Sequence, residues 1–160
     1  MWPIYHAPCS YIASTDCHHS LLTVRETLEY AAQLRLRLSD VQAVQAVVNR
    51  TLLLLDLDKM ADCTVGCDEH PGISKGHMRR LTIGCGLVQE ASLLLLDQPT
   101  CALDAYLSKS VVDLLRTLAD TGRTVLCTIH APSQENFFKF DKVYTWLHLM
   151  TCNSNMMEMP

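Results

Sequence analysis

Two short apolar runs with a helical pattern between them constrain the fold of this chain more than any other feature. Residues 91–96 and 124–129 are almost entirely apolar or β-branched, and each is about as long as a buried strand of a parallel sheet. Between them, residues 105–120 follow a helical period, with Asp104 as the expected N-cap and Gly122 just past the end. A helix that connects two strands makes them parallel, so the second half of the chain predicts an α/β core.

Two residues with reactive side chains directly follow these runs. Asp97 comes after the first run and His130 after the second. Ligands of open parallel sheets bind beyond the carboxyl ends of the strands, where both residues are expected. The pattern alone therefore indicates a binding site at this edge of the sheet.

The first half of the chain predicts three helices. Thr23 and Glu26 fit a capping box, in which the hydroxyl accepts from a free helix N–H and the carboxylate reaches back to the Thr N–H. Ser39 and Gln42 repeat this pattern. The expected helices cover residues 23–38, 39–55 and 74–89, with an irregular stretch at residues 56–73 that contains Gly66, Pro71 and Gly72.

The remaining segments complete a single-domain layout. We expect a short strand at residues 10–13, a loop at 14–20, a short helix at 133–140 and another strand at 142–147. Residues 1–9 are expected to form an irregular lead-in and residues 148–160 a frayed tail. The domain of residues 10–147 then divides into a helical part, about residues 22–90, and a core at residues 91–147.

Composition excludes three classes of protein. The hydrophobic fraction of 49% is too high for a disordered chain. The longest uninterrupted apolar runs, residues 52–55 and 93–96, are far shorter than the ~20 residues that a membrane span requires. A net charge of −4 argues against a nucleic-acid partner, and the N-terminus shows no secretory signal. One soluble domain remains.

Eight cysteines raise the question of disulfides or zinc. Without a secretory signal, the sequence favours reduced cysteines in the core. The alternative is a zinc site at Cys63, Cys67 and His70, with His77 further on, but this spacing fits no common structural zinc pattern. Cys17, His18 and His19 are expected to be loop residues.

Four segments resemble motifs of the ATP-binding cassette (ABC) ATPases, in the order that the family has them. Residues 94–104 (LLLDQPTCALD) are similar to the Walker B and D-loop pattern, an apolar run followed by D-E-P-T-S-G-L-D. Residues 128–133 (TIHAPS) resemble the switch-histidine segment, and residues 73–84 (ISKGHMRRLTIG) resemble the ABC signature. Residues 22–28 (LTVRETL) match a stretch after the Q-loop in the G subfamily, the half-transporters of eye pigments, sterols and drugs.

The resemblance implies an incomplete P-loop NTPase core with parallel strands and an α-helical signature subdomain. It further implies ATP and Mg²⁺ as cofactors and a second G-subfamily half-transporter, with its membrane domain, as partner. Residues 72–76 and 137–142 look closest to the sterol half-transporters. The implied roles are Mg²⁺ through water for Asp97, the γ-phosphate for His130, the signature anion site for Ser74, Lys75, Gly76 and His77, and the D-loop for Asp104.

This sequence departs from the family at the positions on which ATP binding and hydrolysis depend most. No G-x-x-x-x-G-K-S/T phosphate loop occurs in the 160 residues. Gln98 stands where the catalytic Glu would be, and loss of a general base typically costs roughly 10²–10⁴ in rate. Ser14 takes the place of the Q-loop Gln, Lys75 that of a signature Gly, and His77 that of Gln or Glu. We therefore expect weak nucleotide binding and no hydrolysis by this chain alone.

The missing segment also has a consequence for the sheet. In the family, the strand that carries the phosphate loop lies beside the histidine strand, so residues 124–129 are expected to have an unpaired edge and residues 142–147 no neighbour. We expect such a chain to need a partner or a longer product. Three functions stay open: a degenerate domain that completes a composite site, a segment of a lipid-exporting transporter at the cytoplasmic face of a membrane, or a non-catalytic, dominant-negative partner.

Overall fold

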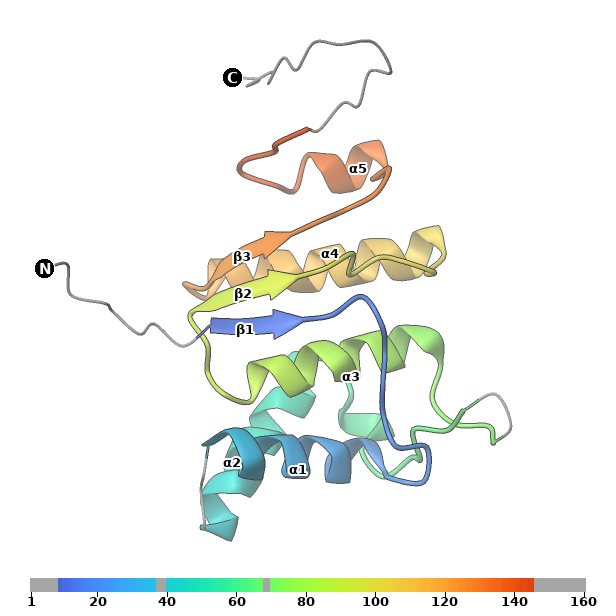
Figure 1. Ribbon diagram of the computed structural model, residues 1–160, viewed down its shortest axis with the longest axis vertical. Coiled ribbons are helices and arrows are strands. Elements are labelled where there is room, and N and C mark those ends of the chain that lie inside the picture. Colours follow the sequence, from blue (N-terminus) through green and yellow to red (C-terminus); the bar gives the residue numbers. More distant parts are fainter. Residues whose placement is uncertain (1–8, 37–39, 68–69, 146–160) are drawn as a thin grey trace, which may run out of the picture.

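A three-stranded parallel sheet forms the centre of the computed structural model, which describes residues 9–36, 40–67 and 70–145 (Figure 1). The strands β1 (Cys9–Ile12), β2 (Leu93–Leu96) and β3 (Thr124–Cys127) lie in the order β1-β2-β3, with Ile12 opposite Leu96 and Leu96 opposite Cys127. The α/β class and the parallel strands predicted from the sequence are thus confirmed. Of the expected lead-in at residues 1–9, Cys9 is instead the first residue of β1, while residues 1–8 and the expected tail at 148–160 lie outside the described residues.

Five α-helices and one 3₁₀ turn surround this sheet in the described part of the chain. They are α1 (Val24–Leu36), α2 (Val41–Leu54), η1 (Asp58–Met60), α3 (Lys75–Leu87), α4 (Ala105–Asp120) and α5 (Gln134–Phe137). Figure 1 shows α1, α2 and α3 together on the β1 side, α4 along β2 and β3, and α5 beyond β3. None of the helices described is long and apolar enough to cross a bilayer.

Side-chain caps start the helices near the positions that the sequence indicates. The Glu26 N–H donates to Thr23 Oγ1 at 3.1 Å while the Thr23 N–H donates to Glu26 Oε2 at 2.8 Å, which confirms this capping box. Helix α2 is capped differently, because the Asp40 carboxylate accepts from the Gln42 N–H at 3.0 Å. The expected box at Ser39 is therefore replaced by Asp40, an equally good N-cap, and Ser39 itself lies outside the described residues.

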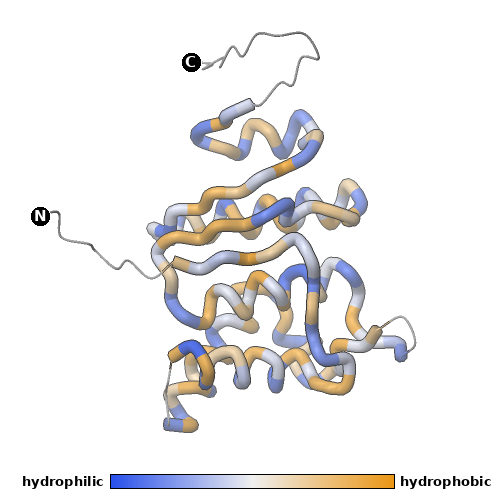
Figure 2. The backbone as a smooth tube through the Cα atoms, viewed as in Figure 1, coloured by the Kyte–Doolittle hydropathy of each residue, from blue (hydrophilic) through white to orange (hydrophobic). Residues whose placement is uncertain are grey.

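The two faces of the sheet differ sharply in burial. Ser10, Ile12, Leu94 and Leu96 point to the face covered by α3 and α4 and are at most 3% exposed. Gly86 lets α3 approach this closely, because a Cβ at its position would lie 2.7 Å from the Ile12 side chain. Alternate residues point the other way. Tyr11, Leu95 and Leu126 share this opposite face, and Tyr11 and Leu126 are 62% and 59% exposed. Figure 2 shows β2 as a continuous hydrophobic segment in the middle of the sheet.

Strand β3 corrects one expectation and confirms another. Its residues alternate between exposed and half-buried, so the prediction of a second fully buried strand was wrong. The reason is that β3 pairs with β2 alone among the described strands, at the edge of the sheet, and Leu126 lies on the open face. This is the unpaired edge that the sequence predicts.

The end of the chain differs from the prediction as well. Residues 142–145 are irregular rather than a strand, and residues 146 and 147 lie outside the described part. A strand is stable only when another strand pairs with it. Among the described residues, no strand is available to pair with residues 142–145. The short helix that precedes this segment is confirmed as α5, with Ser133 as its N-cap.

The cysteines are less buried than expected. Cys85 and Cys127 are partly buried against the core, and burial raises the pKa of each thiol to about 11, which keeps both protonated. The other described cysteines are exposed: Cys9, Cys17, Cys63, Cys67 and Cys101. The prediction of core cysteines was therefore wrong for these five, which lie in loops or at the start of the edge strand β1.

Candidate functional site

Asp97 and Thr128 meet at the carboxyl edge of the sheet. The Thr128 hydroxyl donates to Asp97 Oδ1 at 2.7 Å and accepts from the Gln98 N–H at 2.9 Å. The strand ladder continues up to this point, because the Asp97 N–H donates to the Ile12 carbonyl and the Thr128 N–H to the Leu96 carbonyl. The carboxylate of Asp97 is thus held in one orientation just beyond the ends of two strands.

The chain turns sharply after Asp97. Gln98 has a φ of 44° and Ala102 a φ of 59°, both in the left-handed region that favours glycine. The Gln98 side chain is exposed, so its amide is available to a ligand at this edge. An amide can donate and accept hydrogen bonds, but it does not act as a general base.

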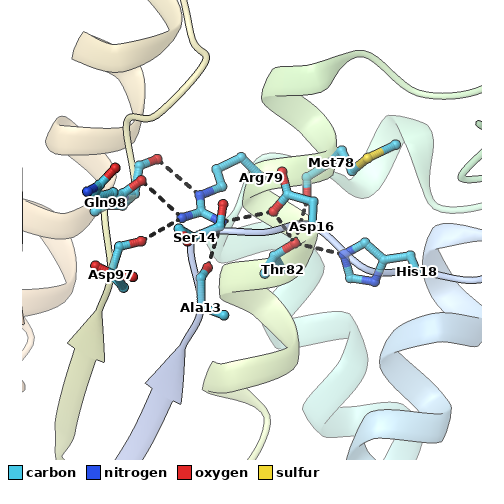
Figure 3. Close-up of polar contacts among 10 residues, drawn as sticks. Ala13, Ser14, Asp16, His18, Met78, Arg79, Thr82, Asp97 and Gln98 are labelled. Atoms are coloured by element: carbon cyan, nitrogen blue, oxygen red, sulfur yellow. Dashed lines mark hydrogen bonds and ion pairs between the residues drawn. The ribbon is translucent and has the colours of Figure 1, made fainter. Parts of the chain in front are cut away.

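Arg79 on α3 connects this turn to the loop after β1, and the sequence analysis gave it no role. Its side chain is buried, at 1% residue exposure. The guanidinium donates to backbone carbonyls of two loops and to one carboxylate (Figure 3). The acceptors are Ala13, Ser14 and Asp16 after β1, and Asp97, Gln98 and Pro99 after β2, at 2.8 to 3.2 Å. A buried cation with this many acceptors is fully compensated.

A signal for Arg79 exists in the sequence. Gly76, Arg79 and Ile83 follow each other at three- and four-residue spacing and are all buried, so Arg79 occupies the face of α3 that points to the core. An arginine on such a stripe is rarely buried unless it is paired. Its neighbour Arg80 instead donates to the Leu55 carbonyl and to Ser110 Oγ on another side of the helix.

Ser14, the residue at the Q-loop position, is brought to the same edge as Asp97 and Gln98. The three residues share one partner, since the Arg79 guanidinium donates to the carbonyl of each. This contact uses the Ser14 backbone and not its hydroxyl. The structure thereby joins three of the predicted site residues through a side chain that was not predicted.

The signature residues lie at the start of α3. Ser74 Oγ accepts from the His77 N–H at 3.3 Å and lies 3.1 Å from His77 Nδ1, so the imidazole folds back onto the cap. Ser74 and Lys75 are exposed, whereas Gly76 is buried against α4. A Cβ on Gly76 would lie 2.6 Å from the Leu107 side chain, so this glycine serves helix packing.

Asp104 and His130 have roles separate from the Arg79 contacts. Asp104 Oδ1 accepts from the Leu107 N–H at 2.8 Å and caps α4, as the helical pattern predicts. His130 is exposed on the loop between β3 and α5. Among the residues that the structure describes, no hydrogen bond or ion pair joins either side chain to another candidate of the site.

His18 is a loop residue, as expected, but it also reaches α3. Its Nε2 lies 2.7 Å from Thr82 Oγ1, and the Thr82 hydroxyl donates to Asp16 Oδ1 at 2.6 Å. Because the Thr82 hydroxyl proton points to Asp16, the imidazole N–H is the donor in the contact with Thr82 Oγ1. Burial lowers the pKa of His18, and the negative charge of Asp16 only partly opposes this shift.

The zinc alternative gains no support from the geometry. Cys67 Sγ lies 3.8 Å from His70 Nδ1, while Cys63 Sγ lies 3.8 Å from the sulfur of Met60. Within residues 9–36, 40–67 and 70–145, no three or more His, Cys, Asp or Glu side chains are grouped so that they could hold a metal ion. A single carboxylate such as Asp97 suits a magnesium ion that keeps most of its water and takes its other ligands from phosphate.

Comparison with known proteins gives one family. The model of the ABC transporter family matches residues 1–101 of the chain. ABC transporter G family member 7 of Arabidopsis thaliana is 39% identical over 84% of the chain and 19% of its own length. ATP-binding cassette sub-family G member 5 of Rattus norvegicus is 40% identical over 91% and 22%, respectively. The ATP-dependent permease PDR12 of Saccharomyces cerevisiae is 38% identical over 87% and 9%. The chain thus spans about a fifth or less of the length of these relatives.

Proposed function

The chain belongs to the ABC transporter family, and from this membership we propose that it is part of the nucleotide-binding domain of a G-subfamily half-transporter. In this function the chain contributes to one composite ATP site and does not hydrolyse ATP by itself. The parent activity is ATP-driven export of lipids or sterols across a membrane, with this domain at the cytoplasmic face. The observation that carries the proposal is the Thr128–Asp97 hydrogen bond at the carboxyl edge of the sheet.

The donor set at this edge fits a magnesium ion. The Asp97 carboxylate is partly exposed and its partner is a neutral hydroxyl, so its oxygens can face a hydrated cation. When bound, Mg²⁺ would neutralise charge on the β- and γ-phosphates of ATP. His130, exposed on the next loop, is the donor that we assign to the γ-phosphate.

Two features support a site that does not turn over unaided. Gln98 presents an exposed amide at the position of the general base, and this group cannot remove a proton from water. The 160 residues also contain no G-x-x-x-x-G-K-S/T segment to cradle phosphates. The first feature affects the chemical step and the second affects the binding of ATP. Gln98→Glu alone is therefore not expected to restore activity.

The signature end of α3 supports the composite arrangement. Ser74 and Lys75 are exposed at the N-terminus of this 13-residue helix, where N–H groups and the helix dipole favour an anion. Lys75 adds a positive charge, although its side chain occupies the space that the family keeps open with glycine. We propose that this end closes over nucleotide held by a second half-transporter.

Binding of Mg–ATP tests the proposal. An intact half-transporter is titrated with ATP in the presence and absence of the 160-residue chain, with and without Mg²⁺. We expect the chain to tighten Mg-dependent binding, Ser74→Glu to abolish this gain by charge repulsion, and Asp62→Ala, an exposed loop residue on the helical side, to leave it unchanged. Equal binding with and without the chain would contradict the composite site.

A second candidate function is a non-catalytic partner that blocks assembly of a half-transporter dimer. The open sheet face favours it, because Tyr11 on β1 and Leu126 on β3 expose large apolar side chains there, and β3 has a free edge among the described strands. Co-purification with an intact half-transporter distinguishes the two functions. Capture that depends on Leu126, is lost in Leu126→Lys and lowers the partner's ATPase activity would select this second function; the surface variant Leu34→Lys on α1 is the control.

A further inference from the structure

Three segments with candidate nucleotide-contacting residues meet at one buried side chain. They are the loop after β1 with Ser14, the turn after β2 with Asp97 and Gln98, and helix α3, whose first turn carries the signature. We propose that Arg79 and Asp16 form a positioning link that fixes these segments relative to each other. A displacement of one loop then changes the position of the other loop. The link rests on the proposed function only in that the segments it joins are those of the nucleotide site.

The division of the Arg79 hydrogen bonds carries this proposal. Nη2 donates to the carbonyls of Asp97 and Gln98 (Figure 3). Nε donates to the carbonyl of Pro99. Nη1 faces the other loop, where it donates to Ala13, Ser14 and the Asp16 carboxylate. A guanidinium is planar and rigid, so the two halves of its fork cannot move separately. Each loop therefore follows the position of the other.

Asp16 fixes the fork from the side of the β1 loop. Its Oδ1 accepts from Arg79 Nη1 at 2.9 Å and from the Thr82 hydroxyl at 2.6 Å. Thr82 lies on α3 three residues after Arg79 and is itself in contact with His18. The carboxylate thereby ties the β1 loop to the same helix from which Arg79 extends. With side chains 2% and 23% exposed, Arg79 and Asp16 form a largely buried pair.

A structural arginine that only fills a space would give a different pattern of responses. It would stabilise the fold as a whole, and a change at Asp16 would disturb the nearby β1 loop and nothing beyond it. A positioning link instead predicts that a change at Asp16 is felt at the turn after β2, which Asp16 does not contact through any of its hydrogen bonds. The two possibilities thus differ at a remote site.

One backbone amide reports on this turn. The Cys101 N–H donates to the Gln98 carbonyl at 3.0 Å, and the same carbonyl accepts from Arg79 Nη2. Amide hydrogen exchange at Cys101 therefore measures how firmly the turn is held. The Gly122 N–H, which donates to the Ala119 carbonyl at the end of α4, provides a comparable turn amide away from the link.

The experiment measures exchange in the full chain without nucleotide for Asp16→Asn and Arg79→Lys. We expect exchange at Cys101 to rise about tenfold in both variants, the size of one lost charged hydrogen bond, with Gly122 unchanged. Arg80→Lys is the matched control, since it removes the guanidinium contacts to Leu55 and Ser110 without touching either loop. It should leave Cys101 at the wild-type rate.

An exchange rate at Cys101 that is unchanged in Asp16→Asn, or raised equally in Arg80→Lys, would overturn the link. Should Arg79→Lys fail to fold, Asp16→Asn decides the matter, because its exchange rate at Cys101 is compared with those of the wild-type chain and of Arg80→Lys. Because no nucleotide is present, failure of ATP binding would count against the proposed function and leave these exchange results as they are.

Discussion

The Thr128 hydroxyl, from the segment after β3, donates to the Asp97 carboxylate at the end of β2, at 2.7 Å. The same hydroxyl accepts from the Gln98 N–H at 2.9 Å, so one small side chain fixes both the carboxylate and the turn that follows it. Thr128 lies two residues before His130 and begins the segment TIHAPS, in which only the histidine has a role predicted from the sequence. The threonine of this segment therefore has a structural role, because its hydroxyl holds Asp97 and Gln98.

Removal of this hydroxyl should lower the stability of the chain modestly. Thr128→Val leaves the Asp97 carboxylate and the Gln98 N–H without their shared partner, at an expected cost of about 1 kcal/mol in the free energy of unfolding. The bond is solvent-exposed, so water compensates part of this loss. Urea unfolding measures the change, and Thr128→Ser, which keeps the hydroxyl, should stay within about 0.5 kcal/mol of wild type. An equal loss in Thr128→Ser, which keeps the hydroxyl, would contradict a stabilising role of this hydrogen bond.

Glycine should be preferred over alanine in the turn before α4. Ala102 has a φ of 59°, where the ABC pattern D-E-P-T-S-G-L-D carries Gly, and a Cβ in this region costs about 1–2 kcal/mol. Ala102→Gly recovers part of this strain but gives the unfolded chain more freedom, so we expect a net gain of about 0.5–1 kcal/mol in stability.

Gly122 provides the matched opposite case. Its φ is +92° and a Cβ would meet no atom within 4 Å, so conformation alone decides the effect of a substitution. Gly122→Ala should lower the free energy of unfolding by about 1 kcal/mol. Both variants are measured by urea unfolding with a common slope. Equal signs for the two changes would contradict the assignment of strain to Ala102.

His18 should make the chain less stable in mild acid. Burial lowers its pKa in the folded chain relative to about 6.5 in the unfolded chain, despite the opposing effect of Asp16. The unfolded chain then binds the proton more tightly, so the His18 contribution is complete above about pH 6.5 and is lost as the pH falls towards the lowered pKa.

His18→Gln separates this titration from the hydrogen bond, because the Gln amide can still donate to Thr82 but does not titrate. Between about pH 7.5 and pH 5.5, the wild-type chain should lose more stability than the variant. Unfolding free energies at the two pH values give the comparison. Parallel losses in both proteins would show that other groups, and not His18, cause the acid sensitivity.

Local signals predicted the helix starts and the class of the sheet. Thr23, Ser74, Asp104 and Ser133 cap helices because each capping bond forms within a few residues of sequence. The parallel order follows from the alternation of strand and helix, which needs no knowledge of distant contacts. Asp97 after β2 was predicted on the same basis.

The rest depends on which segments meet in space. Arg79 gains its acceptors because two loops converge on α3. One of these loops lies more than 60 residues before Arg79 in the sequence. The exposure of β3 and the irregular residues 142–145 follow from neighbours of the sheet and not from the apolar pattern of these residues themselves. A strand propensity states what a segment can do when a partner strand is present, and the partner decides the outcome.

Phosphate release shows whether this chain hydrolyses ATP by itself. The 160-residue chain is incubated with Mg–ATP beside Asp97→Ala and Gln98→Glu, and inorganic phosphate is measured over time. We expect all three proteins to release phosphate at the rate of buffer alone, because the general base is absent in wild type and the phosphate cradle is absent from every variant. Turnover by the wild-type chain that Asp97→Ala abolishes would contradict the account.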